Sequence, residues 1–283
     1  WRLNTHGGLL QAPAVASDDP RALGPQDLVI VAVKGQALPM AAASVAAFLH
    51  EQSIVLPAMN GVPWWFCHGL PGFGDTLASV DPTGAIAAAI PFEQVLGCVV
   101  HASTSCPEPG LVQHKMGQGL IVGEPRGGES ARVARVAALL SGAGFDVTAS
   151  ANVRYDIWYK LWGNLTMNPV SAITGATIDR VLADAEVRAF CSQTMREAAA
   201  IGARIGCAIA QSPEDRHAIT AKLGAFKTSM LQDVEAGRSI ELDAIVGAVY
   251  EISRGVGVDA PNVAALLGLT RLFAQSRGLY PNS

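Results

Sequence analysis

The hydrophobic pattern of this chain changes character once, near residue 151. Before that point, short runs rich in β-branched residues alternate with helical stretches, and after it strand-like runs disappear and apolar residues recur at helical spacing. Alternating strands and helices build a parallel α/β sheet, whereas unbroken helical periodicity builds a packed set of helices. We therefore predict an α/β domain over residues 1–151 and an all-helical domain over residues 152–283.

Strand-like runs in the first half supply the expected sheet. Asp27–Val33 and Ser53–Asn60 flank an alanine-rich helical stretch, which is the order of a parallel strand–helix–strand unit. Trp1–Val15 alternates like part of a hairpin. Later segments predict a strand, an antiparallel pair joined at a glycine-containing turn, a helix and a strand: Cys98–Thr104, Leu111–Gly117 with Gly119–Pro125, Ser130–Gly144 and Phe145–Val153.

Helical periodicity dominates the second half. Pro213 and Pro261 stand where the first turn of a helix accepts proline. Four long helical stretches are expected there: Ala183–Gly206, Pro213–Phe226, Ile240–Gly257 and Pro261–Gly278.

Charge and cysteine usage bound the partners. A formal net charge of −4 and a pI near 5.9 give no basic field for nucleic acid or an anionic membrane. No apolar run reaches the roughly 18 residues of a membrane span. The five cysteines are odd in number and include no C-x-x-C pair, which is typical of reduced thiols in a cytoplasmic protein. We expect a small-molecule partner.

Several kinds of chemistry lack their motifs. The six histidines are widely spaced, so a metal site is not expected. Neither a G-x-S-x-G nucleophile elbow nor a G-x-x-x-x-G-K-[ST] phosphate loop is present, which counts against hydrolase and kinase activity.

A polar stripe runs along an otherwise apolar segment, Asp156–Val170. Lys160, Asn164 and Asn168 are spaced four apart. On a helix each such step drifts by only about 40°, so the three side chains share one face. A solvated face is one interpretation, and an array of hydrogen-bonding groups for a ligand is the other. Pro169 favours the second, because proline inside a helix frees a carbonyl and kinks the chain.

A second group of polar residues surrounds a helix break at Gly237. Ser229 leads a helical stretch before the break, while Glu241 and Asp243 begin the apolar helix after it. One carboxylate could cap that helix. Alternatively, Glu241 faces Lys160 across a cleft between the domains and keeps the ammonium charged and oriented.

Two residues follow the parallel strands directly. Asn60 precedes Gly61 after the second strand, and Lys34 ends the first. Because open α/β sheets bind ligands beyond the carboxyl ends of their strands, both are placed to touch a cofactor or substrate. A plain Asn-Gly turn and an exposed strand-end lysine are the simpler alternatives.

Three separated segments together resemble the signature segments of the ketopantoate reductase family (2-dehydropantoate 2-reductases). They are "MNG" at residues 59–61, "WYKLWGNLTMNP" at residues 158–169 and "TSMLQDVEAGRSIELD" at residues 228–243. The resemblance covers nearly the whole chain in order and spacing. It implies a Rossmann-like, doubly wound α/β domain followed by an all-α domain similar to the C-terminal domain of 6-phosphogluconate dehydrogenase.

The resemblance also implies a reaction and its residues. NADPH would deliver hydride to the keto carbon of 2-dehydropantoate, giving pantoate for pantothenate biosynthesis, with Lys160 as general acid and the protein acting as a homodimer. Glu241 would contact the cofactor while organising the site. The substrate-binding residues would be Asn60, Asn164, Asn168 and Ser229, and the cofactor-binding residues Lys34, Asn60, Ser103 and Glu241.

The sequence departs from the family pattern in two places. The dinucleotide fingerprint G-x-G-x-x-G is absent, so we expect roughly one strand–helix–strand unit, on the order of 30 residues, upstream of this numbering. The choice of NADPH over NADH consequently rests on resemblance alone. Trp64 and Trp65 stand where the family usually has small residues, and they either shape the substrate pocket or cover the edge of the sheet.

Two other functions remain open. One is a related dehydrogenase of the same superfamily acting on another 2-oxo acid or a 3-hydroxy acid. The other is a non-catalytic dinucleotide-binding paralogue, against which the combination of Lys160, Asn164, Asn168 and Glu241 argues, because a binding protein needs no proton donor.

Overall fold

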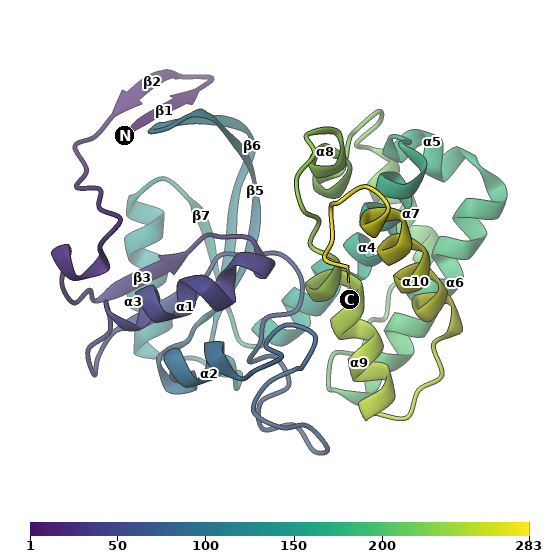
Figure 1. Ribbon diagram of the computed structural model, residues 1–283, viewed down its shortest axis with the longest axis horizontal. Coiled ribbons are helices and arrows are strands. Elements are labelled where there is room, and N and C mark those ends of the chain that lie inside the picture. Colours follow the sequence, from purple (N-terminus) through teal and green to yellow (C-terminus); the bar gives the residue numbers. More distant parts are fainter. Residues whose placement is uncertain (283) are drawn as a thin grey trace. The chain divides into compact units, whose positions relative to one another are not determined.

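The computed structural model of the protein describes residues 1–282. Its backbone forms two compact units (Figure 1). The first unit contains residues 1–33, 38–59 and 88–153, and holds all the strands. The second contains residues 34–37, 60–87 and 154–282. The helical unit thus also includes two segments that follow strands in the first half of the chain, one of four residues and one of 28 residues.

The first unit contains a mixed sheet and a separate parallel pair. The mixed sheet has the order β2-β1-β6-β5, with β7 also pairing with β6, while β3 and β4 pair in parallel. The strands are β1 (Arg2–Thr5), β2 (Gly8–Gln11), β3 (Leu28–Val31), β4 (Ile54–Pro57), β5 (Gly97–Glu108), β6 (Leu111–Gly123) and β7 (Asp146–Ser150).

Most of the predicted elements of this unit are confirmed. The first residues form the β1–β2 hairpin, and β3, α1 (Leu38–Ala46) and β4 form the expected parallel unit. The long helix α3 (Ala131–Gly142) precedes β7. The short helices among the first 153 residues are η1 (Pro20–Ala22), η2 (Gly35–Ala37), α2 (Ala85–Ala89) and η3 (Phe92–Gln94).

The predicted antiparallel pair within residues 111–125 is wrong. These residues form one continuous strand, β6, and its antiparallel partner is β5. Gly117 does adopt a left-handed φ of +74°, which explains the turn-like signal. However, a Cβ at Gly117 would lie 2.3 Å from the His101 carbonyl oxygen, so the glycine allows two strands to approach at a bulge.

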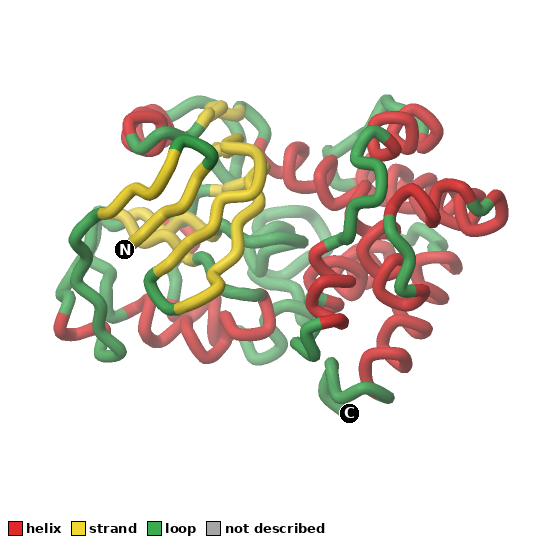
Figure 2. The backbone as a smooth tube through the Cα atoms, turned by 90° about the horizontal axis from the view of Figure 1, so that it is seen from above, coloured by secondary structure: helices red, strands yellow, loops and turns green. Residues whose placement is uncertain are grey.

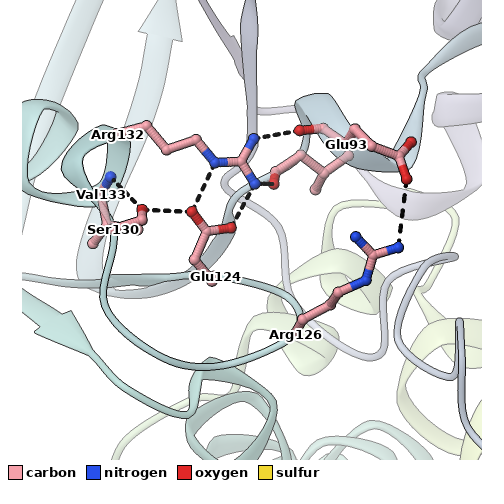
Figure 3. Close-up of polar contacts among 7 residues, drawn as sticks. Glu93, Glu124, Arg126, Ser130, Arg132 and Val133 are labelled. Carbon is pink, nitrogen blue, oxygen red and sulfur yellow. Dashed lines mark hydrogen bonds and ion pairs between the residues drawn. The ribbon is translucent and has the colours of Figure 1, made fainter.

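An ionic cluster fastens the start of α3 to the segment before β5 (Figure 3). The Ser130 hydroxyl caps α3 by accepting from Val133 N–H and donates to Glu124 at 2.5 Å. Arg132 pairs with both oxygens of Glu124 and also donates to the carbonyl of Glu93. Arg126 adds a longer contact of 3.4 Å to the Glu93 carboxylate. The apolar face of α3 then packs on β4, β5 and β6 in the core of the unit.

The second unit is built from helices and loops, which Figure 2 shows in red and green. Pro213 and Pro261 occupy the first turns of their helices, as predicted. The elements are α4 (Val153–Thr174), α5 (Ile178–Ala183), α6 (Ala185–Arg204), α7 (Pro213–Ala221), α8 (Ser229–Glu235), the π-helix η4 (Asp243–Gly247), α9 (Ala248–Gly255) and α10 (Pro261–Gln275).

Two indoles seat α4 on α6. Trp158 and Trp162 are almost fully buried, and each donates its indole N–H to a main-chain carbonyl of α6, at 3.2 Å and 2.7 Å. A buried indole whose N–H is hydrogen-bonded contributes apolar packing and also fixes the orientation of its helix. The polar stripe of α4 is therefore held away from α6.

The loop at residues 60–87 packs along η4 and α9. Its Ala78 and Ser79 N–H groups donate to the Glu251 carboxylate at 2.8 and 2.7 Å. Trp64 and Trp65 are 2% and 1% exposed, and the neighbouring Phe66 stacks on Trp158. Both tryptophans thus belong to the interior of the helical unit.

Among residues 1–282, no helix has the length and apolarity to cross a membrane. Within the same range, no group of three or more His, Cys, Asp or Glu side chains is arranged to hold a metal ion.

Candidate active site

The predicted polar stripe lies on one long helix. α4 contains Lys160, Asn164 and Asn168, and it continues through Pro169 to Thr174. The exposure of these side chains falls along the stripe, from the half-buried Lys160 and Asn164 to Asn168, which is 4% exposed. A solvated face would not bury its last amide, so the solvated interpretation fails at Asn168, and the ligand-binding interpretation stays a prediction.

Lys160, at the N-terminal end of the stripe, contacts Asn60. The Lys160 Nζ donates a hydrogen bond to the Asn60 Oδ1 at 2.8 Å, and both residues are half-buried. Both belong to the helical unit, because the loop that begins at Asn60 is part of that unit. A hydrogen bond between an ammonium and an amide oxygen fixes the direction of the cation while leaving its charge intact.

Asn168, at the C-terminal end of the stripe, lies beside Ser229. The Asn168 Nδ2 lies 3.5 Å from the Ser229 Oγ, which is at the outer limit of a hydrogen bond. Ser229 is exposed and occupies the first turn of α8, where Thr228 provides the cap. The amide and hydroxyl are thus together but only loosely engaged with each other, as expected of groups that can bind a third partner.

Glu241 stands just before η4 and does not cap it. Its Oε1 accepts a hydrogen bond from the Gly35 N–H at 3.1 Å. Burial raises the pKa of the Glu241 carboxyl above its usual range, while the Gly35 N–H and the ammonium groups of Lys34 and Lys160 oppose that shift. The carboxylate therefore lies within electrostatic reach of both lysines of the predicted site.

Lys34 is engaged by a residue that the sequence did not single out. Its ammonium pairs with the carboxylate of Asp233, and the Asp233 side chain is only 7% exposed. Arg238 binds the same carboxylate at 3.0 Å. Asp233 is four residues after Ser229 and is buried on the inward face of α8. In the sequence, a carboxylate on an otherwise apolar helix face is the pattern that could have identified it.

Ser103 belongs to the other compact unit. It pairs with Met116 at the bulge between β5 and β6 and is half-buried. Its predicted place near the cofactor stays a prediction. The remaining predicted residues, by contrast, all lie in the helical unit: Lys34, Asn60, Lys160, Asn164, Asn168, Ser229 and Glu241.

The arrangement brings together groups of the kind that stabilise and protonate a developing oxyanion. An ammonium oriented by an amide can stabilise negative charge on a nearby oxygen and then protonate it. The buried Glu241 carboxyl lies within electrostatic reach of that ammonium. The amides of Asn164 and Asn168 on α4 and the hydroxyl of Ser229 on α8 are donors of the kind that bind an anionic or carbonyl-bearing small molecule.

Comparison with known proteins decides the family. The model for "Ketopantoate reductase PanE/ApbA" matches residues 2–127, and the model for "Ketopantoate reductase PanE/ApbA C terminal" matches residues 152–274. The chain belongs to the ketopantoate reductase family. The predicted resemblance, the fold class and the oxidoreductase class are confirmed.

Individual relatives agree with this family over almost the whole chain. A 2-dehydropantoate 2-reductase of Mesorhizobium japonicum is 40% identical over 281 residues, covering 99% of this chain and 86% of the relative. A solved structure from Ralstonia solanacearum, assigned as a ketopantoate reductase, is 53% identical with a TM-score of 0.94, and the match covers 99% of this chain and 86% of that one.

A more distant solved structure shares the ketopantoate reductase fold. D-mandelate dehydrogenase, solved with NADH and anilino(oxo)acetate, is 20% identical with a TM-score of 0.79, and covers 98% of this chain and 85% of its own. At that identity the likeness concerns the fold alone.

Proposed function

We propose that the protein reduces 2-dehydropantoate to pantoate with NADPH, a step of pantothenate and coenzyme A biosynthesis. The observation that carries the proposal is the ammonium of Lys160, held by Asn60 on the same helix face as two further amides. Family membership supports the reaction, and a relative that is 40% identical is a 2-dehydropantoate 2-reductase.

Lys160 acts as the general acid in this proposal. As hydride reaches the keto carbon, negative charge develops on the carbonyl oxygen, and a positioned ammonium stabilises that charge and then donates its proton. Asn60 keeps the Lys160 Nζ pointed at the reacting oxygen. Glu241, which lies within electrostatic reach of Lys160, favours its charged form before the transfer.

Asn164, Asn168 and Ser229 bind the substrate in this proposal. Asn168 and Ser229 lie together with a weak mutual contact of 3.5 Å, so an incoming carboxylate or hydroxyl can replace that contact with stronger ones. Asn164 lies between this pair and Lys160 along α4, where it can reach the middle of a small 2-oxo acid.

A dinucleotide fits the residues that follow the parallel strands. Lys34 comes after β3 with its side chain 37% exposed, and Asn60 comes after β4. The carboxyl ends of parallel strands are where such ligands bind in open α/β folds, and Lys34, whose ammonium is paired with Asp233, lies there. Bound NADPH would supply the hydride. Lys34, Asn60, Ser103 and Glu241 are the residues that we assign to its binding.

We also assign the protein to the cytoplasm and to a homodimer. None of the five cysteines forms a disulfide in the structure, as is usual for cytoplasmic proteins. The dimer rests on likeness to the ketopantoate reductases. Sedimentation velocity of the purified protein tests it, since a single species at the mass of one chain would contradict the dimer.

The function is tested by turnover with a panel of 2-oxo acids. Purified protein is mixed with NADPH or NADH and ketopantoate, phenylglyoxylate or pyruvate, and the loss of reduced-nicotinamide absorbance is followed. The proposal predicts the highest kcat/KM with ketopantoate and NADPH. A higher value with another 2-oxo acid would instead assign a related dehydrogenase, and no turnover with any acid would favour the non-catalytic paralogue.

A further inference from the structure

The turn after Asn60 fits tightly onto the π-helix η4. Gly61 has φ of +80°, and a Cβ built on it would lie 2.6 Å from the Ala244 carbonyl oxygen and 2.7 Å from the Ala244 Cβ. The next residue, Val62, donates its N–H to the same carbonyl at 2.8 Å. The chain therefore passes so close to η4 that only glycine fits at position 61.

The π-helix makes that carbonyl available. In an α-helix the Ala244 carbonyl would accept from the N–H of Ala248, four residues on. Here the Ala248 N–H instead donates to the Asp243 carbonyl, five residues back. The widened turn thus leaves the Ala244 oxygen for Val62, and Tyr280 donates a 2.6 Å hydrogen bond to the Asp243 carboxylate in the same turn.

The close contact between Gly61 and Ala244 of η4 controls where Asn60 lies. Asn60 is bonded directly to Gly61, and its Oδ1 accepts from Lys160 at 2.8 Å. A Cβ at Gly61 would force the turn away from Ala244 by most of an ångström, because ordinary van der Waals contact begins near 3.4 Å. A displacement of that size, carried to Asn60, is enough to break the hydrogen bond to Lys160.

We propose that Gly61, seated on η4, is a positioning residue that sets the Asn60–Lys160 hydrogen bond for catalysis. The inference rests on the proposed function, because it assigns Gly61 a role in the same reduction. Its effect passes through Asn60 and not through contact with the substrate. In this proposal the π-helix that follows Glu241 leaves the Ala244 carbonyl free of its usual helical donor, so that it can accept the hydrogen bond from the turn.

Gly61→Ala is the test variant, and Gly69→Ala is its matched control. Gly69 lies in the same loop with φ of +75°, but a Cβ there would meet no heavy atom within 4 Å. Both variants carry the backbone strain of alanine in the left-handed region, and only the first also meets Ala244. We expect kcat to fall about 10-fold or more for Gly61→Ala and to stay within about 2-fold for Gly69→Ala.

A double-mutant cycle separates positioning from a general loss of structure. In an Asn60→Ala background, Gly61→Ala is expected to lower kcat by no more than about 2-fold, because the group that it displaces is already gone. An unchanged 10-fold loss in that background would overturn the proposal, as would equal kcat values for Gly61→Ala and Gly69→Ala. Absence of turnover in the wild type would overturn the proposed function and this inference together.

A second variant keeps the test decisive if Gly61→Ala does not fold. Tyr280→Phe removes the hydrogen bond to Asp243 and loosens η4 without adding an atom near Asn60. It is expected to lower kcat about 3-fold in the wild type and to have no further effect in Asn60→Ala. The same loss in both backgrounds would show that η4 does not act through Asn60.

Discussion

The ammonium nitrogen of Lys160 donates a 2.8 Å hydrogen bond to the side-chain oxygen of Asn60, a residue 100 positions earlier in the chain. This bond connects the long helix α4 with the turn after β4, and both residues lie in the helical unit. The proton donor of the proposed reaction therefore has its direction fixed before any ligand binds. Such preorganisation is the form in which a protein contributes most to stabilising a developing charge.

Replacing Asn60 is expected to slow the reaction. Asn60→Ala leaves the Lys160 ammonium without its amide acceptor, and hydrogen bonds to charged groups contribute about 1.5–3 kcal/mol. We predict a fall in kcat of about 10-fold or more in steady-state assays. Asn4→Ala is the control, because it removes a side-chain amide bond of 2.9 Å to Gln113 in the other compact unit. Equal kcat values for the two variants would contradict the role of Asn60.

Replacing Ser229 is expected to weaken substrate binding. Its exposed hydroxyl lies 3.5 Å from the Asn168 amide, and we assign both groups to the substrate. Ser229→Ala should raise KM for the 2-oxo acid about 5-fold or more while changing kcat less. Ser276→Ala, at the exposed end of α10, should leave both constants unchanged. Unchanged kcat and KM in Ser229→Ala would move Ser229 out of the substrate site.

Much of this site was predictable, because its spacing is local. The four-residue steps from Lys160 to Asn168 define one face of a helix whatever the helix packs against, and α4 carries them as predicted. The β3–α1–β4 unit followed equally from apolar runs on either side of an alanine-rich helix. Local periodicity carries that information within a single window of sequence.

The unpredicted features depend on contacts between distant segments. Gly117 gave the sequence pattern of a turn, although it lies inside the continuous strand β6. Only its close approach to the His101 carbonyl shows why this position of the strand is a glycine. The carboxylate of Asp233 becomes part of the site through Lys34, which is 199 positions away and pairs with it. The seat of Gly61 on Ala244 likewise joins two segments that no periodicity relates.

The buried carboxyl of Glu241 predicts a pH-dependent stability. Its pKa is raised above the ordinary value of 4.5, so as pH rises the unfolded state loses its proton first and the folded state becomes relatively less stable. Glu241→Gln removes this effect. We predict that the Tm of the wild type, measured relative to the variant, declines as pH rises above about 4.5, until the folded-state carboxyl has also lost its proton. A difference in Tm that rises over this interval would contradict the buried position of the carboxyl.

The cysteines should differ sharply in reactivity. Burial raises the pKa of Cys67 and Cys191 to about 12 and that of Cys207 to about 11, and Cys98 is also buried. Only the thiolate reacts quickly, so these four thiols should be protected in the folded protein near pH 8. Cys106 is exposed, and we predict that a disulfide reagent modifies it alone until the protein is unfolded. Rapid labelling of Cys106→Ser would contradict this.

Turnover of ketopantoate by Lys160→Ala tests the central claim most directly. The wild type and the variant are compared at saturating ketopantoate and NADPH, with Lys222→Ala as the control, since Lys222 is exposed at the end of α7. Removing a general acid should lower kcat by about 10²-fold or more, whereas Lys222→Ala should match the wild type. Near-normal turnover by a folded Lys160→Ala protein would contradict the assignment of Lys160 as the proton donor.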